Sequence, residues 1–278
     1  MVVSVFYIRS SWNNLFTQVI KPFIIQHQSN IKSWCIYFSS THGDHITLAI
    51  KTVDNVRIEK NFLETAGNFL SLNPSEKNII EFPLEDFFMD YPNNSIQFNK
   101  SKSLAHSWDN SSQKDRQQAI SKALIEALGN DVIDMESIYT FLIYMQLGII
   151  QSAYPDIRIA CSLAPNILIC WGNTEDIENE KADYEFTGLI QLFKNNKEIF
   201  RKIIKDVWKE HYNSELRWLY EWESACRKFI KTDFSEEFIS LSTLLCKHLG
   251  LNEKMVEISF QLIFNAFKQL PEHGQPVN

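Results

Sequence analysis

Residues 32–51 read KSWCIYFSSTHGDHITLAIK, and this stretch decides the fold that we predict for the N-terminal half. Its two apolar-rich runs, Ser33–Phe38 and Ile46–Ile50, contain the aromatic and β-branched residues that strands favour. The polar connection between them includes Gly43, which allows a positive φ, and Asp44, a common turn residue. The stretch therefore predicts a β-hairpin with hydroxyl groups and two imidazoles at its tip.

The segments on either side of the hairpin predict further strands and helices. Val2–Arg9 reads as a strand, and Trp12–Gln28 has apolar residues at helical spacing. Because Pro22 falls inside this pattern, a kink or a break is expected near Lys21. After the hairpin, Asp54 is a candidate N-cap for a helix that reaches about Ser71. A strand, a helix, a hairpin and a second helix indicate an α+β fold, with helices on one face of a mostly antiparallel sheet.

The sequence changes character after residue 73. Asn73–Ser112 is rich in Asn, Ser, Pro and Lys and contains two strand-like pieces, Asn78–Phe82 and Ser95–Phe98. Helices are predicted at Arg116–Leu128, Met135–Gln151, Phe186–His211, Ser214–Ile230, Glu236–Leu249 and Glu253–Leu270, while Ile157–Trp171 stays ambiguous because Pro165 divides it. We predict a single domain over residues 1–278, in which a mostly antiparallel N-terminal sheet with flanking helices precedes a helical C-terminal half.

The composition is that of a globular protein with a substantial core. The chain has 278 residues, of which 45% are hydrophobic and 22% are charged. Its net charge of −7 argues against broad nucleic-acid binding, because phosphate contacts require clustered Lys and Arg. No apolar run has the length of a membrane helix, and the N-terminal MVVSVFYIRSSW lacks the basic lead of a signal peptide. We therefore expect a cytoplasmic protein that binds neither nucleic acid nor membrane.

The cysteines point to the same compartment. There are five of them, an odd number, and no two form a CxxC pair. Buried free thiols in a reducing environment are therefore predicted rather than disulfides.

Several common catalytic motifs are missing. The sequence has no Gly-rich phosphate loop, no HExxH, no GxSxG and no CxxC. His42 and His45 are spaced like a metal-binding pair, but the sequence identifies no third ligand, so we do not predict a metal. Instead, His45 is expected to begin a strand and His42 to lie at the solvated tip, where either imidazole suits general acid–base catalysis near neutral pH.

A third histidine lies far away in the sequence. His248 is near the end of a predicted apolar helix, just before Gly250. Two interpretations stay open: the imidazole favours the negative end of the helix dipole, or it takes part in catalysis.

Three segments in this order resemble one known family. They are WNNLFTQVIKPFI at 12–24, IKSWCIYFSSTHGDHITLAIK at 31–51 and CKHLGLNEKMVEISFQLIF at 246–264. Together they are similar to the C-terminal elimination domain of lantibiotic dehydratases, which also occurs alone as the thiopeptide-type bacteriocin biosynthesis protein. The resemblance spans nearly the whole chain. It rests on a helix with a late Pro, an aromatic strand, a polar turn, a strand led by His, and a late His followed by Asn and Glu.

The resemblance implies a role in the maturation of ribosomally made peptides. In full-length dehydratases, the domain removes glutamate from glutamylated Ser or Thr, which leaves a dehydroamino acid. Stand-alone relatives perform that elimination, or a formal [4+2] cycloaddition that joins two dehydroalanines into the six-membered nitrogen ring of thiopeptides and expels the leader peptide. In the cycloaddition the substrate supplies the reactive groups, so no cofactor is expected.

The hairpin of this chain departs from the family pattern. Aligned on His45, the positions where the family typically carries arginines are Phe38, Thr47 and Ala49. An arginine can hold a departing carboxylate with two hydrogen bonds, which Phe, Thr and Ala cannot do. The family's Tyr-Gly-Gly stretch is also missing, and YPNNSIQFNK stands near its place. These departures favour cycloaddition over glutamate elimination.

The leading hypothesis is therefore a stand-alone pyridine-forming enzyme. It would act on a leader-bearing precursor peptide that other enzymes of the pathway have already dehydrated. A histidine would transfer protons and a hydroxyl would donate a hydrogen bond, and the predicted catalytic residues are His45, His248, Tyr37, Ser39 and His42. The N-terminal sheet and Asn73–Ser112 are expected to bind the leader.

Two alternatives stay open. The chain could be the detached elimination half of a split dehydratase, with a replacement for the missing arginines among Arg116, Arg158, Arg201 and Arg217. It could instead be a non-catalytic partner that recognises a leader peptide in a modification complex, since lost arginines are also what a degenerate site would show. The resemblance further implies a homodimer, because members of the family associate.

Overall fold

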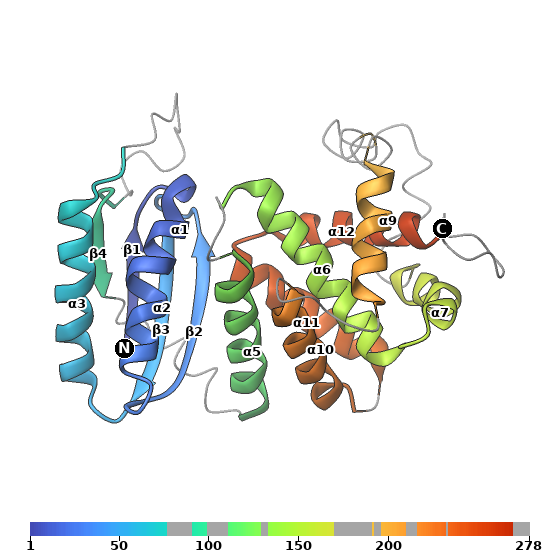
Figure 1. The fold of residues 1–278 in the computed structure, drawn as a ribbon, viewed down its shortest axis with the longest axis horizontal. Helices are drawn as coiled ribbons and strands as arrows, with labels where there is room; N and C mark the ends of the chain where they lie inside the picture. Colours follow the sequence, from blue (N-terminus) through green and yellow to red (C-terminus); the bar gives the residue numbers. More distant parts are fainter. Residues whose placement is uncertain are drawn as a thin grey trace. The chain divides into compact units, whose positions relative to one another are not determined.

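The computed structural model describes residues 1–76, 91–98, 111–128, 133–169, 191, 196–209, 216–231 and 233–268. The chain divides into two compact units, Met1–Phe141 with Lys247–Gly250 and Leu142–Cys246 with Leu251–Asn278. The first unit contains a four-stranded sheet, and the second is built from helices (Figure 1). The predicted α+β class, with an N-terminal antiparallel sheet and a mostly helical remainder, is confirmed. That both units make a single domain of the predicted family stays a prediction.

The sheet has the strand order β2-β3-β1-β4, and every neighbouring pair is antiparallel. Its strands are β1 (Val2–Phe6), β2 (Ile31–Ser39), β3 (His45–Thr52) and β4 (Ser95–Phe98). The predicted hairpin is the β2–β3 pair. The strand predicted to reach Arg9 ends at Phe6, because Arg9 already belongs to the 3-10 turn η1 (Arg9–Ser11). The other predicted strand piece, at 78–82, lies outside the described residues.

The helix after β1 changes its winding before Pro22. It consists of α1 (Trp12–Leu15), a π-helical turn η2 (Phe16–Ile20) and α2 (Lys21–Gln26), with Pro22 in the first turn of α2. Proline has no N–H to continue an α-helical ladder, and a π-helical turn absorbs the interruption. The kink or break expected near Lys21 therefore takes the form of a widened turn.

Helices cover one face of the sheet. The rings of Trp12 and Phe16 contact Phe38 of β2, with ring centroids 4.7 and 5.7 Å apart. The next helix, α3 (Asn55–Leu72), packs against α2 through an edge-on contact between Phe23 and Phe62. The Asp54 carboxylate accepts a hydrogen bond from the backbone N–H of Arg57, as predicted for an N-cap. Aromatic side chains thus form the core between these helices and this face of the sheet.

Two side chains form hydrogen bonds with the backbone of β2 on the side that faces away from β3. The helix α5 (Ser111–Leu128) lies beside this edge (Figure 1), and its Ser121 hydroxyl accepts a hydrogen bond from the Ile36 N–H at 3.0 Å. The end of α11 (Phe234–Leu249) provides the second cap, because Nδ1 of His248 lies 2.6 Å from the Ile36 carbonyl oxygen. Both backbone groups that Ile36 turns away from β3 are thus satisfied.

Five further helices are described. They are α6 (Met135–Ala153), α7 (Ile157–Ile169), α9 (Lys197–Val207), α10 (Arg217–Phe229) and α12 (Glu253–Lys268). The ambiguous segment around Pro165 is thus helical over Ile157–Ile169. In the second unit, the indole N–H of Trp222 donates to the Met145 carbonyl at 2.8 Å, and Gly148 allows the close approach of this ring. Among the described residues, no helix has both the length and the apolarity needed to cross a membrane.

Candidate functional site

Most of the predicted site residues share one face of the sheet. In the β2–β3 ladder, Tyr37 is opposite Thr47 and Ser39 is opposite His45. In the β1–β3 ladder, Ser4 is opposite Thr47 and Phe6 is opposite His45. Because side chains alternate along a strand, these six residues point to the side opposite Phe38 and its aromatic core. We call this side the His45 face and define it by Ser4, Phe6, Tyr37, Ser39, His45 and Thr47.

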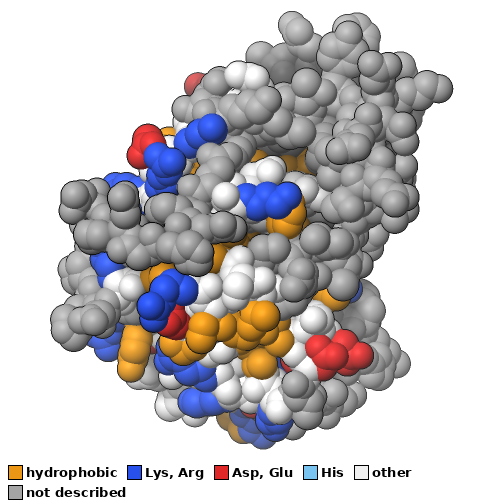
Figure 2. All heavy atoms as spheres, turned by 90° about the vertical axis from the view of Figure 1, so that its right-hand side faces the viewer, with side chains coloured by type: hydrophobic (Ala, Val, Ile, Leu, Met, Phe, Trp, Pro, Cys, Tyr) orange, Lys and Arg blue, Asp and Glu red, His pale blue; other side chains and the backbone are white. Residues whose placement is uncertain are grey.

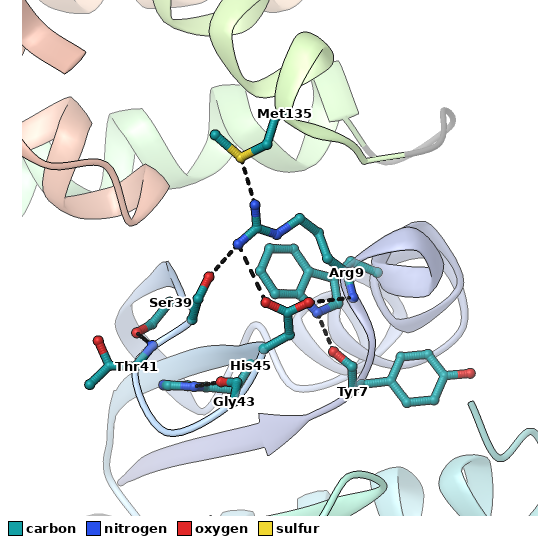
Figure 3. A network of polar contacts seen from close by, with 10 residues as sticks. Tyr7, Arg9, Ser39, Thr41, Gly43, His45 and Met135 are labelled. Atoms are coloured by element: carbon teal, nitrogen blue, oxygen red, sulfur yellow. Dashed lines mark hydrogen bonds and ion pairs between the residues drawn. The ribbon is translucent and has the colours of Figure 1, made fainter. Parts of the chain in front are cut away.

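His45 is half-buried at the start of β3, in an orientation fixed by the loop. Its Nδ1 lies 2.8 Å from the carbonyl oxygen of Gly43 (Figure 3). Its ring packs against Phe6 at an interplanar angle of 34°, with centroids 4.5 Å apart. A carbonyl can only accept a hydrogen bond, so Nδ1 carries the proton and Nε2 presents a lone pair. Burial lowers the pKa of His45, although the bond to Gly43 acts in the opposite direction. His45 is therefore a neutral imidazole with an oriented acceptor.

The hairpin loop is held by an arginine that the sequence interpretation did not single out. The guanidinium of Arg9 contacts Asp44, Ser40 and the Met135 sulfur, and its carbon atom lies 5.3 Å from the centre of the Trp12 ring. The Arg9 backbone N–H also donates to the Asp44 carboxylate, at 3.2 Å. Figure 3 shows the guanidinium turned away from the imidazole of His45. Arg9 thus fixes the loop that positions His45 and is itself engaged by a carboxylate.

His42 is less exposed than a solvated tip residue would be. It adopts a positive φ of 62°, and its Nδ1 is buried without a hydrogen-bond partner among the described residues. The ring of Tyr91 packs edge-on against His42, with centroids 6.5 Å apart, and also contacts Phe6 at 4.9 Å. The His42 carbonyl accepts a hydrogen bond from the Tyr91 N–H. Tyr91 therefore joins His42 to the aromatic end of the His45 face.

The structure brings His248 onto the same face from the other end of the chain. Its ring is fully buried and stacks on Tyr37, with centroids 4.3 Å apart and an interplanar angle of 26°. Burial lowers the pKa of His248 to about 4, against the opposing effect of its bond to the Ile36 carbonyl. A neutral imidazole adds no charge to the helix end, so the interpretation through the helix dipole is not supported.

Two hydroxyl groups complete the predicted set. Burial raises the pKa of Tyr37, so its phenol stays protonated and can donate; the Cys35 thiol lies 3.5 Å from the phenol oxygen. The Ser39 hydroxyl accepts from the Thr41 N–H at 3.1 Å and keeps its own proton for another acceptor. Beside them, Ser4 and Thr47 share a buried hydrogen bond of 2.8 Å. The site therefore combines two neutral imidazoles with hydroxyl donors.

The positions compared with the family's arginines do not form one group. Thr47 and Ala49 are on the His45 side of β3, whereas Phe38 points into the aromatic core and is 2% exposed. Among the proposed replacements, Arg158, Arg201 and Arg217 each pair with a carboxylate nearby in the sequence, namely Asp156, Glu198 and Glu221. Arg9 stands at the hairpin instead. Its signal in the sequence was its place at the end of the predicted strand Val2–Arg9.

The described residues contain no group of three His, Cys, Asp or Glu side chains placed to hold a metal ion. Their four cysteines, Cys35, Cys161, Cys226 and Cys246, are free thiols, in agreement with the prediction. Most of the segment expected to bind a leader peptide, residues 77–90 and 99–110, lies outside the described residues.

Comparisons with solved structures show likenesses in fold over nearly the whole chain. A solved structure with this fold is "Pyridine synthase, TbtD, from thiomuracin biosynthesis", which matches with a TM-score of 0.64 and 12% sequence identity over 97% of each chain. A second is TsrL, with a TM-score of 0.51 and 12% identity over 97% of this chain and 94% of that one. No protein-family model matches the sequence, and no curated protein matches it.

Proposed function

We propose that this protein is a peptide-maturation enzyme that forms a six-membered nitrogen ring from two dehydroalanines of a leader-bearing precursor. The observation that carries this proposal is the likeness in fold to a pyridine synthase over 97% of both chains. The chemistry of the His45 face supports it, because the reaction needs proton transfer and hydrogen bonding more than it needs fixed charge.

The reaction assigns a role to each of three side chains. Nε2 of His45 takes the N–H proton of the amide that joins the preceding residue to one dehydroalanine and delivers it to the carbonyl oxygen of the same amide, to which the Tyr37 phenol donates a hydrogen bond. This proton shift gives the hydroxy-substituted 2-azadiene tautomer. Two carbon–carbon bonds then form to the second dehydroalanine. Loss of the hydroxyl group with one ring C–H proton as water, and of the leader nitrogen with a second ring C–H proton as the leader carboxamide, leaves the pyridine. His45 takes the first of these protons and returns it to the departing hydroxyl, and Ser39 provides a further donor beside it.

The neutral state of His45 suits the first of these steps. A general base must be unprotonated at the working pH, and burial keeps the pKa of His45 below its ordinary value. The hydrogen bond from Nδ1 to Gly43 also selects the tautomer whose lone pair is on Nε2. The loop that supplies this carbonyl is in turn fixed by the pairing of Arg9 with Asp44.

The same geometry disfavours glutamate elimination. A departing glutamate needs a cation to bind its carboxylate, and the arginine at the hairpin loop is already paired with Asp44. Thr47 and Ala49, on the same face as His45, offer no cation. For Arg9 to serve in elimination, it would have to exchange the Asp44 carboxylate for the departing one.

Mass spectrometry of a leader-bearing peptide with two dehydroalanines, incubated with the purified protein, tests the proposal. We expect loss of the leader as a separate product and a new aromatic ultraviolet chromophore in the core. A glutamylated peptide that loses glutamate under the same conditions would establish elimination instead. Binding of the leader peptide without conversion of either substrate would establish a non-catalytic partner.

A further inference from the structure

We propose that His248 is a positioning residue for Tyr37 rather than a proton-transfer residue, an inference that rests on the proposed function. The imidazole is anchored on the strand carbonyl of Ile36 and forms a flat support under the phenol ring that donates in the reaction. The role therefore differs from the catalytic one that its residue type first suggested.

A hydrogen bond to the backbone of β2 anchors the imidazole of His248. Nδ1 of His248 lies 2.6 Å from the Ile36 carbonyl on β2, which is an edge strand of the sheet that the described residues form. The opposite hydrogen-bonding group of the same residue, the Ile36 N–H, is capped by Ser121. The two side chains together take the place of a neighbouring strand, so the imidazole cannot rotate without leaving a buried carbonyl unpaired.

The turn at the end of α11 lies very close to β2. Gly250 follows His248 with a φ of +66°, and a Cβ at this position would lie 2.6 Å from the Phe38 carbonyl oxygen. Only glycine permits both this conformation and this close approach. The turn that follows His248 is thus in direct contact with the strand that contains Tyr37.

The imidazole of His248 stacks on the phenol ring of Tyr37. Tyr37 and His248 rings lie 4.3 Å apart at 26°, and the Tyr37 ring also packs on the cluster of Val2, Cys35 and Ala49. The imidazole thus fixes the plane of the phenol and the direction of its hydroxyl. His248 itself is 0% exposed, and its Nε2 has no hydrogen-bond partner among the described residues. A group enclosed in this way supports its neighbour but does not meet a substrate.

The test compares two replacements in the full-length protein. His248→Phe keeps a flat ring and loses the anchor, whereas His248→Leu loses the ring. We expect kcat of the Phe variant to stay within about threefold of wild type, and kcat of the Leu variant to fall about tenfold or more at an unchanged KM, because small misplacements of reacting groups are costly. Loss of turnover in both variants would indicate proton transfer by His248, and an unchanged kcat in both would indicate a structural role; either result overturns the inference.

Two further measurements separate positioning from loss of stability. Ser121→Ala removes the other cap of Ile36 without touching Tyr37, so it should lower the melting temperature and leave kcat unchanged. In a double-mutant cycle, His248→Leu should cost little once Tyr37→Phe has removed the hydroxyl, because the two act through one group. If the losses in kcat of the two single variants add up in the double variant, the proposal is contradicted.

A spectroscopic measurement decides the question even if the protein converts no peptide. With 3-fluorotyrosine at position 37, the fluorine resonance should keep its position in His248→Phe and move toward that of the free amino acid in His248→Leu. A resonance that His248→Leu leaves unmoved would refute the positioning role, whereas an inactive wild type would refute only the proposed reaction.

Discussion

Nδ1 of His248 lies 2.6 Å from the carbonyl oxygen of Ile36, although 212 residues separate the two in the chain. This contact ties the end of α11 to the edge strand of the sheet, and burial keeps the imidazole neutral against the opposing effect of the hydrogen bond. Because burial favours the uncharged form, His248 links the stability of the first unit to pH.

Acid should destabilise the protein through His248. Its pKa is about 4 in the folded protein and near 6.5 when unfolded, so the unfolded state binds the proton first as the pH falls. The contribution is complete above about pH 6.5 and is lost toward pH 4, for a total of about 3 kcal/mol. Urea unfolding at a series of pH values measures it. His248→Phe, which cannot titrate, should lose most of this dependence, and a variant as acid-sensitive as wild type would contradict the assignment.

Gly250→Ala should be strongly destabilising. The new Cβ would meet the Phe38 carbonyl oxygen at 2.6 Å, and alanine is strained at a φ of +66°. We expect a loss of about 2–4 kcal/mol in the free energy of unfolding. Gly67→Ala is the matched control, because nothing lies within 4 Å of its Cβ in the middle of α3, and it should be neutral or stabilising. Equal effects of the two substitutions in chemical denaturation would disprove the close approach.

His45→Gln should remove the acid–base function without unfolding the protein. We expect kcat/KM for ring formation to fall about 10²–10⁴-fold, which is the usual contribution of a general base to the rate. In wild type, the rate should rise with pH through a midpoint below the ordinary pKa of histidine and then level off, because burial lowers the pKa of His45. His27→Gln, at the end of α2, is the control and should keep both rate and profile. If the rate of His45→Gln still falls at low pH as in wild type, the titrating group is a residue other than His45.

Asp44→Ala should loosen the hairpin loop. The Asp44 carboxylate accepts from both the backbone N–H and the guanidinium of Arg9, so its loss removes two contacts. We expect a cost of about 1 kcal/mol, since the pair is only partly buried, and faster amide exchange at Gly43. Glu221→Ala breaks the pair with Arg217 at an exposed position and should leave the melting temperature unchanged. Exchange at Gly43 that stays at the wild-type rate would show that Arg9 does not hold the loop.

The sequence by itself determined the local elements and their order. Alternating apolar and β-branched residues predicted the hairpin, Asp54 predicted the start of α3, and Gly250 separated the last two helices. These features depend on residues close together in the chain, whose periodicity and backbone preferences act before any tertiary contact forms.

Only the tertiary structure decided which groups meet and in which protonation state. The strand register placed Tyr37, Ser39 and His45 on one face, and packing brought His248 beneath Tyr37 from the far end of the chain. The roles of Arg9 and Ser121 follow from the same long-range contacts. Burial, register and edge capping are properties of the assembled sheet and its helices, and a residue type alone therefore does not distinguish a proton-transfer histidine from a buried support.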